Sequence, residues 1–140
     1  MPSTGFFEWR HYKPAGAKKD IAYPYYISLK DQPVFYMAGI YQPWTDKETG
    51  ETMDTFSIVT TKANGLMEQI HNKKKRMPTI LNEALAAEWL SPNLSEFKIM
   101  ELATTACDGS LMSAYTIDKS FRTTSDPKTR FEYPEVPGLI

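Results

Sequence analysis

The sequence contains a single cysteine, Cys107, and two histidines, His11 and His71. One cysteine cannot form an internal disulfide framework, and its scarcity fits a reducing compartment. Two histidines without paired cysteines match no metal-site spacing. We therefore expect no metal and no other cofactor.

An excess of charge and a long apolar run are also lacking. The 16 Lys and Arg residues nearly balance 17 Asp and Glu residues, for a formal net charge of −1. No apolar run approaches membrane-spanning length, and the N-terminus resembles no secretory signal, so we expect no membrane partner. Contact with nucleic acid would have to come from a local basic patch, because the net charge supplies no bulk attraction.

The 140 residues are enough for one domain with a buried core. Apolar alternation predicts strands, and four-residue apolar spacing predicts short helices. The predicted strands are 1–10, 25–30, 34–41, 54–60 and 111–118, and the predicted helices are 64–70, 82–90 and 94–102. The run 34–41 is apolar on both faces, which predicts a central strand that pairs with 54–60 as a hairpin. We expect an α+β fold with a curved, mainly antiparallel sheet over residues 1–122. Residues 123–140 should form an irregular C-terminal tail that is loose unless something binds it.

Glu8 stands among large aromatics in Gly5-Phe6-Phe7-Glu8-Trp9-Arg10. A carboxylate beside apolar bulk requires a partner or a chemical role. One hypothesis pairs Glu8 with His71 as an acid and base beside an anion-binding patch. The alternative makes Glu8 a solvent-facing strand residue and His71 a satisfied histidine at a helix end.

The densest basic run, Lys73-Lys74-Lys75-Arg76, directly follows His71 and Asn72. It could hold phosphates, or it could be a solvated loop. Trp9 could stack on bases beside such a patch or pack in the core, whereas we expect Trp44 to pack in the core.

Several motifs in order resemble the SOS-response-associated peptidase (SRAP) family, whose members are also described as abasic-site processing proteins. The resemblance extends over most of the chain. The motifs are Gly5-Phe6-Phe7-Glu8-Trp9, Met37-Ala38-Gly39-Ile40-Tyr41, Phe56 to Asn64, Ile70-His71 followed by Arg76-Met77-Pro78, Trp89-Leu90, and Ala114 to Asp118.

The resemblance implies chemistry at an N-terminal cysteine, whose amine and thiol capture the ring-opened aldehyde of an abasic site in single-stranded DNA. This chain begins Met1-Pro2 and matches neither that cysteine nor the asparagine-bearing segment that follows it in the family. We therefore expect the C-terminal part of a SRAP domain, from a truncated or split gene or a misplaced start codon. Whether this chain alone is an enzyme is left open.

Carried over by motif, the resemblance implies that Glu8 and His71 are the catalytic residues, which handle protons. Arg76, with Lys74, Lys75 and Trp9, would bind DNA. The implied setting is the SOS response to DNA damage in the bacterial cytoplasm, in association with the nucleoid. The implied partner is single-stranded DNA with an abasic site, bound covalently by the complete protein.

Two alternatives remain. The chain could be a noncatalytic fragment or interaction module, which pairs with a separate N-terminal piece or with itself through exposed strand edges. It could also be a peptidase that acts beyond self-processing. A dyad of Cys107 with His71 has no local signature, so we expect Cys107 to be a small buried hydrophobe.

Overall fold

The computed structural model describes residues 1–140, in which short antiparallel strands and three α-helices surround a main core. The strands are β1 (Pro2–Ser3), β2 (Phe6–Tyr12), β3 (Ile21–Leu29), β4 (Phe35–Met37), β5 (Gly39–Thr45), β6 (Thr52–Ile58), β7 (Thr60–Lys62), β8 (Arg76–Pro78), β9 (Ile80–Leu81) and β10 (Met112–Thr116). The helices are α1 (Gly65–Ile70), α2 (Glu83–Trp89) and α3 (Glu96–Ala103), and two 3-10 turns are η1 (Gly109–Leu111) and η2 (Phe121–Thr123). The expected α+β class with antiparallel strands and short helices is confirmed.

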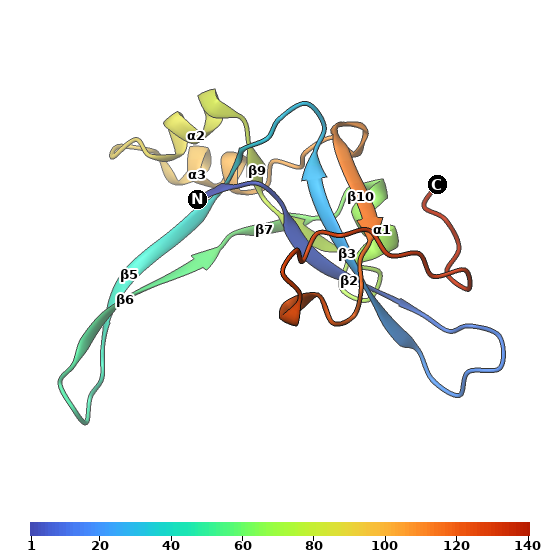
Figure 1. Ribbon diagram of the computed structural model, residues 1–140. Helices are drawn as coiled ribbons and strands as arrows, with labels where there is room; N and C mark the ends of the chain where they lie inside the picture. The colour runs from blue at the N-terminus through green and yellow to red at the C-terminus, as the bar shows by residue number, and fades with distance from the viewer.

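The strands form four small sheets, ordered β1-β4-β9, β10-β3-β2, β5-β6 and β7-β8. The β10-β3-β2 sheet lies on the side of the molecule opposite α2, α3 and the β5-β6 hairpin (Figure 1). Side chains alternate across β2, so Phe6 packs on the main core while Phe7 and Trp9 pack on a smaller cluster around Phe121. Both faces of this strand are therefore covered.

The three predicted helices are present, and each begins at a polar cap. The side chains of Asn64, Asn82 and Ser95 accept hydrogen bonds from the first turns of α1, α2 and α3. Such caps satisfy backbone donors that have no partner within the helix. In α1, Met67 and Ile70 are fully buried, which anchors the helix in the main core.

The prediction of a central strand over 34–41 is wrong. The chain divides there into β4 and β5, and only Phe35, Met37 and Ala38 are buried. The side chains of Ile40 and Tyr41 are 60% and 81% exposed. The predicted hairpin with the following strand does form, but β5 and β6 project from the body as a two-stranded ribbon that no third strand joins (Figure 1). Trp44 lies on this ribbon and is exposed, which corrects its expected place in the core.

Residues 124–140 contain no helix or strand, yet they pack against the body, unlike the loose segment expected. The Tyr23 hydroxyl donates to a Glu135 carboxylate oxygen over 3.0 Å. The Ile140 backbone exchanges two hydrogen bonds of 2.9 Å with the Gln69 side chain. These contacts tie the segment to both β3 and α1.

No helix in the structure has the length and apolarity needed to span a membrane.

Candidate active site

Glu8 of β2 and His71, which follows α1, converge in the structure. The Glu8 Oε2 atom lies 3.7 Å from His71 Nδ1, and the two side chains are 23% and 19% exposed. The β2 alternation places Glu8 on the face that α1 covers, and the buried Ile70 directs the end of α1 toward that face. The fold therefore forms the acid and imidazole pair that the sequence suggested.

Fixed backbone groups orient both side chains. Glu8 Oε1 accepts a hydrogen bond from the Trp9 backbone N–H at 3.0 Å, which leaves Oε2 toward His71. His71 Nδ1 lies 2.8 Å from the Arg76 carbonyl oxygen. Because both neighbours of Nδ1 are acceptors, a hydrogen on this nitrogen satisfies the geometry. The second ring nitrogen is then an acceptor when the ring is neutral and a donor when it is protonated.

The pair lies in a cavity of about 390 Å³. Apolar walls surround a few polar groups, as in most ligand pockets. The walls include Phe6, Met37, Ile58 and Met77, and the polar lining residues include Ser3, Glu8, Thr60, His71 and Arg76. This cavity can therefore hold a small polar group against a carboxylate, an imidazole and a guanidinium.

The basic run forms a turn that projects from the body and ends beside the cavity. The Lys75 backbone N–H donates to the His71 carbonyl over 2.8 Å, and Lys75 has a positive φ of 50°. The three lysines therefore loop outward, and Arg76 comes back beside His71 at the start of β8. Lys74, Lys75 and Arg76 are exposed, whereas Lys73 pairs with Asp20 at 3.5 Å. Arg76 and its two lysine neighbours thus remain available to phosphates.

Trp9 does not join this cavity. Its ring lies on the other face of β2, with centroid 6.2 Å from that of Phe121 and 5.6 Å from the guanidinium carbon of Arg122. A DNA contact by Trp9 stays a prediction, and any such contact would come from the face opposite Glu8.

Two residues at the site had no signal of their own in the sequence. The Asn72 side chain exchanges hydrogen bonds of 2.7 and 3.1 Å with the backbone of His11, which ties the segment after α1 to the edge of β2. Lys62 stands opposite Arg76 in the β7-β8 register and adds an exposed cation. The position of Lys62 beside Arg76 follows from the register of β7 and β8, which the sequence did not reveal.

Cys107 belongs to the packing around the main core and is half-buried. Burial raises the pKa of its thiol, and the neighbouring Asp108 carboxylate adds to this effect. The polar contacts of the His71 imidazole are with Glu8 and Arg76 and do not include Cys107. This environment disfavours a thiolate nucleophile. The structure gathers no three His, Cys, Asp or Glu side chains in a metal-binding arrangement.

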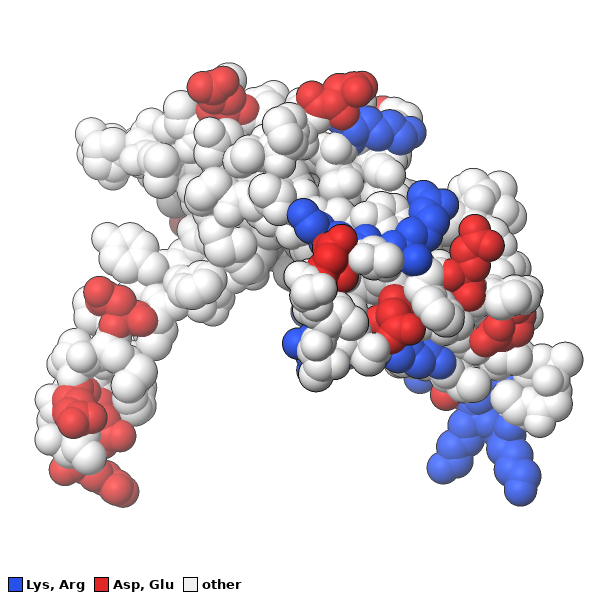
Figure 2. Space-filling model, viewed as in Figure 1, with Lys and Arg blue, Asp and Glu red and all other residues white.

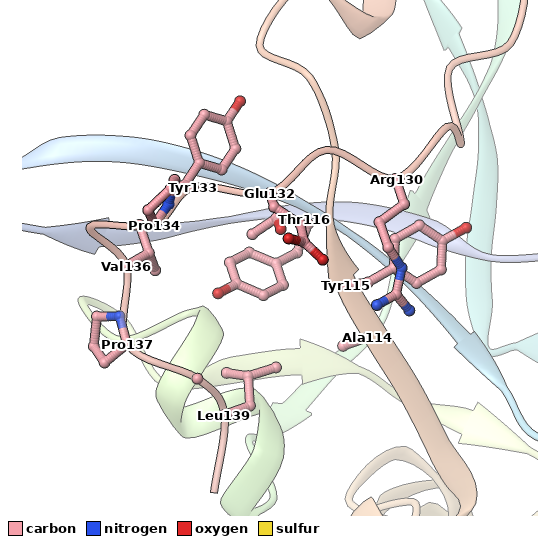
Figure 3. A pocket seen from close by; sticks show the side chains of 12 residues that line it. Ala114, Tyr115, Thr116, Arg130, Glu132, Tyr133, Pro134, Val136, Pro137 and Leu139 are labelled. Atoms are coloured by element: carbon pink, nitrogen blue, oxygen red, sulfur yellow. The ribbon is translucent and has the colours of Figure 1, made fainter.

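A second cavity of about 440 Å³ lies between β10 and the C-terminal segment (Figure 3). Arg130 lies over the Tyr115 ring at 4.8 Å, and Glu132 lines the same cavity. The Tyr133 hydroxyl donates a hydrogen bond to the Ile117 carbonyl oxygen over 3.0 Å. This cavity contains no imidazole, so the Glu8 and His71 cavity is the stronger candidate for acid and base chemistry.

Known proteins share both the sequence pattern and the fold. The abasic site processing protein YoqW of Bacillus subtilis is 36% identical over 117 residues, which are 84% of this chain and 48% of YoqW. YobE of the same organism, also called an abasic site processing protein, is 34% identical over 117 residues, or 84% of this chain and 49% of YobE. The crystal structure of a Bacteroides thetaiotaomicron protein matches with a TM-score of 0.78 and 47% identity, and covers 92% of this chain and 52% of that chain.

The chain thus spans about half the length of the curated relatives it matches. The model of one family, SOS response associated peptidase (SRAP), matches residues 1–123. This chain belongs to the SRAP family.

Proposed function

We propose that this chain supplies the acid and base side chains and the phosphate-binding cations of an abasic-site processing domain that acts on single-stranded DNA. The observation that carries the proposal is the convergence of Glu8 and His71, 3.7 Å apart, in a cavity that Arg76 also lines. The named function of the relatives YoqW and YobE supports the same substrate class.

Covalent capture of an abasic site begins at the aldehyde carbon of the opened sugar. An amine nitrogen adds to that carbon, the addition product loses water, and an imine remains. The attacking amine must lose two protons, one on addition and one after water leaves, and the carbonyl oxygen must gain two protons before it departs as water. Glu8, as a carboxylate, is suited to accept protons from the nitrogen. His71, when protonated, is suited to donate to the departing oxygen, so that each proton taken from nitrogen is balanced by one delivered to oxygen.

The cations beside the cavity would hold the DNA. Arg76 offers a bidentate guanidinium at the rim, and Lys74 and Lys75 extend the positive charge outward. The opened sugar could then enter the cavity while its flanking phosphates stay on this basic edge. A single strand suits this arrangement because its sugar is free to leave the stack.

The nucleophile would come from the half of the domain that these residues do not include. The family resemblance implies an N-terminal cysteine, and the one cysteine here is half-buried Cys107. Free cysteine can replace that nucleophile in an assay, because it carries an amine and a thiol on adjacent carbons.

The test mixes the 140-residue chain, free cysteine and a single-stranded oligonucleotide with one abasic site. We expect the chain to accelerate formation of the cysteine adduct, followed by gel shift and mass spectrometry. Glu8→Gln and His71→Asn should each slow this acceleration about tenfold or more, in line with general acid and base catalysis. Glu132→Gln, a carboxylate of the second cavity, is the matched control.

DNA binding is measured separately by fluorescence anisotropy. Arg76→Gln should weaken binding of the abasic strand about tenfold, whereas Lys47→Gln on the acidic ribbon should not. Equal rates for Glu8→Gln, His71→Asn and the unmodified chain would refute the assigned roles.

A further inference from the structure

The β5-β6 ribbon is an apolar element without a cover. Its exposed side chains include Ile40, Tyr41, Trp44, Met53 and Phe56, of which Tyr41 and Phe56 are 81% and 68% exposed. The register pairs Tyr41 with Phe56 and Trp44 with Met53, and these pairs lie on opposite faces of the ribbon. A two-stranded ribbon with two apolar faces is marginal in water by itself, so its composition indicates burial against another element.

The apolar surface continues from the ribbon onto the helices. A cavity of about 420 Å³ lies where the base of β5 meets α2 and the segment that leads into α3. The Trp89 indole N–H donates to the Gly39 carbonyl at 3.0 Å, which fixes α2 against the ribbon. We define the ribbon-helix surface as Ile40, Tyr41, Trp89, Leu90 and Ile99, which line this cavity. Leu90 is 81% exposed and Ile40 is 60% exposed, so the surface is uncovered.

Charge on the ribbon excludes DNA as the occupant. The tip carries Asp46, Glu48 and Glu51 against the single cation Lys47, and Asp54 of β6 adds a fourth carboxylate near the tip. Figure 2 shows acidic side chains along this arm, while the Lys and Arg side chains visible in this view lie on the rest of the molecule. Phosphates would be repelled from this arm, so a polypeptide is the class of partner that fits an apolar ribbon with an acidic tip.

The length comparison indicates which polypeptide. The Bacteroides thetaiotaomicron structure has the same fold at 47% identity, but this chain covers only 52% of it. We infer that the ribbon-helix surface is the docking site for the half of a SRAP domain that these residues do not include. This inference rests on the proposed function, because that half would also bring the nucleophile to the Glu8 and His71 cavity.

The experiment coexpresses the full 140-residue chain with an affinity-tagged segment of the Bacteroides thetaiotaomicron protein, namely the part that this chain does not match. We expect a one-to-one complex in native mass spectrometry after tag purification. Tyr41→Asp and Leu90→Asp should each lower the recovered complex at least tenfold. Leu111→Asp is the matched control, because Leu111 is also an exposed apolar residue, at 53%, and lies on η1 outside this surface.

Circular dichroism of each purified variant checks that it is folded. Hydrogen exchange provides a second measurement that needs no variant. The backbone amide hydrogens of β5 and β6 should exchange more slowly in the complex than in the free chain. A folded chain that recovers no tagged segment would overturn the inference, as would equal recovery by Tyr41→Asp and Leu111→Asp. A dimer of this chain closed through the ribbon would also overturn it. A complex that forms but gives no adduct with abasic DNA would refute the proposed function and leave the docking site standing.

Discussion

Two hairpins of this protein, β2-β3 and β5-β6, have the same pairing and opposite surroundings. Each is antiparallel with seven residue pairs in register. In the first hairpin β10 adds a third strand to β3, and side chains cover both faces. The second receives no third strand and exposes most of its side chains. Strand pairing is thus a local property, whereas burial depends on what the rest of the fold brings against the faces.

The covered hairpin is also the one that carries the candidate site. Glu8 gains its histidine because α1 packs on β2, and Asn72 binds the edge of that strand. The ribbon has apolar side chains but only an acidic tip and no titratable pair in a cavity. The candidate site therefore lies on the hairpin whose faces are covered, because a side chain can be positioned only by elements that contact it.

The largest difference should appear between two isoleucines. Ile27 of β3 is fully buried, and Ile40 of β5 is 60% exposed. We expect Ile27→Ala to lower the free energy of unfolding by about 2–5 kcal/mol, because it leaves a cavity in the core. Ile40→Ala should change it by less than about 0.5 kcal/mol. Urea unfolding followed by circular dichroism measures both, and equal losses would show that the ribbon is as well packed as the core.

Two glycines give the next largest contrast. A Cβ on Gly5 would lie 2.4 Å from the Tyr26 ring, whereas a Cβ on Gly39 of β5 would be 3.4 Å from the Ser57 carbonyl oxygen. Gly5→Ala should therefore lower the free energy of unfolding by about 1–3 kcal/mol through overpacking. Gly39→Ala should have a smaller effect. The same urea experiment measures both, and a Gly5→Ala protein as stable as the parent would mean that Tyr26 moves away freely.

Asn72 should have a smaller but specific effect. Asn72→Ala removes both hydrogen bonds to the His11 backbone, for an expected loss of about 1–2 kcal/mol in unfolding free energy. It should also slow cysteine adduct formation, because His71 would lose its adjacent anchor. Exposed Asn93 is the control, and Asn93→Ala should leave stability and rate unchanged. Loss of stability without loss of rate would show that Asn72 does not position His71.

The smallest effect should be a pH dependence at the alkaline end. Burial raises the pKa of Tyr23, and its hydrogen bond to Glu135 raises it further. The unfolded chain then loses the phenolic proton before the folded chain does, so stability should be fully present below about pH 10 and fall as the pH rises further. Tyr23→Phe should flatten this fall, measured by urea unfolding between pH 8 and 10.5. Exposed Tyr41 is the control on the ribbon, and Tyr41→Phe should leave the slope as it is.

Local patterns in the sequence predicted most elements of the fold. Alternation predicted strands at β3, β6 and β10, and the four-residue apolar spacing predicted all three helices. The hydrophobic pattern could not distinguish buried β4 from exposed β5, because an apolar run has the same composition whether its side chains are buried or exposed. The packing of the C-terminal segment against the body was not predicted for a related reason, since its contacts to β3 and α1 join residues far apart in the chain.

The candidate site shows the same division. Its residue types were visible in the sequence: one glutamate among aromatics, one histidine after an apolar helix, and a basic run. Their convergence was not visible, because Glu8 and His71 lie 63 positions apart in the sequence and only the packing of α1 on β2 brings them within 3.7 Å. The sequence by itself determined the local elements and the chemical groups, through backbone preference and apolar periodicity. The tertiary structure alone decided which groups meet and which apolar faces remain uncovered, because both depend on contacts between distant segments.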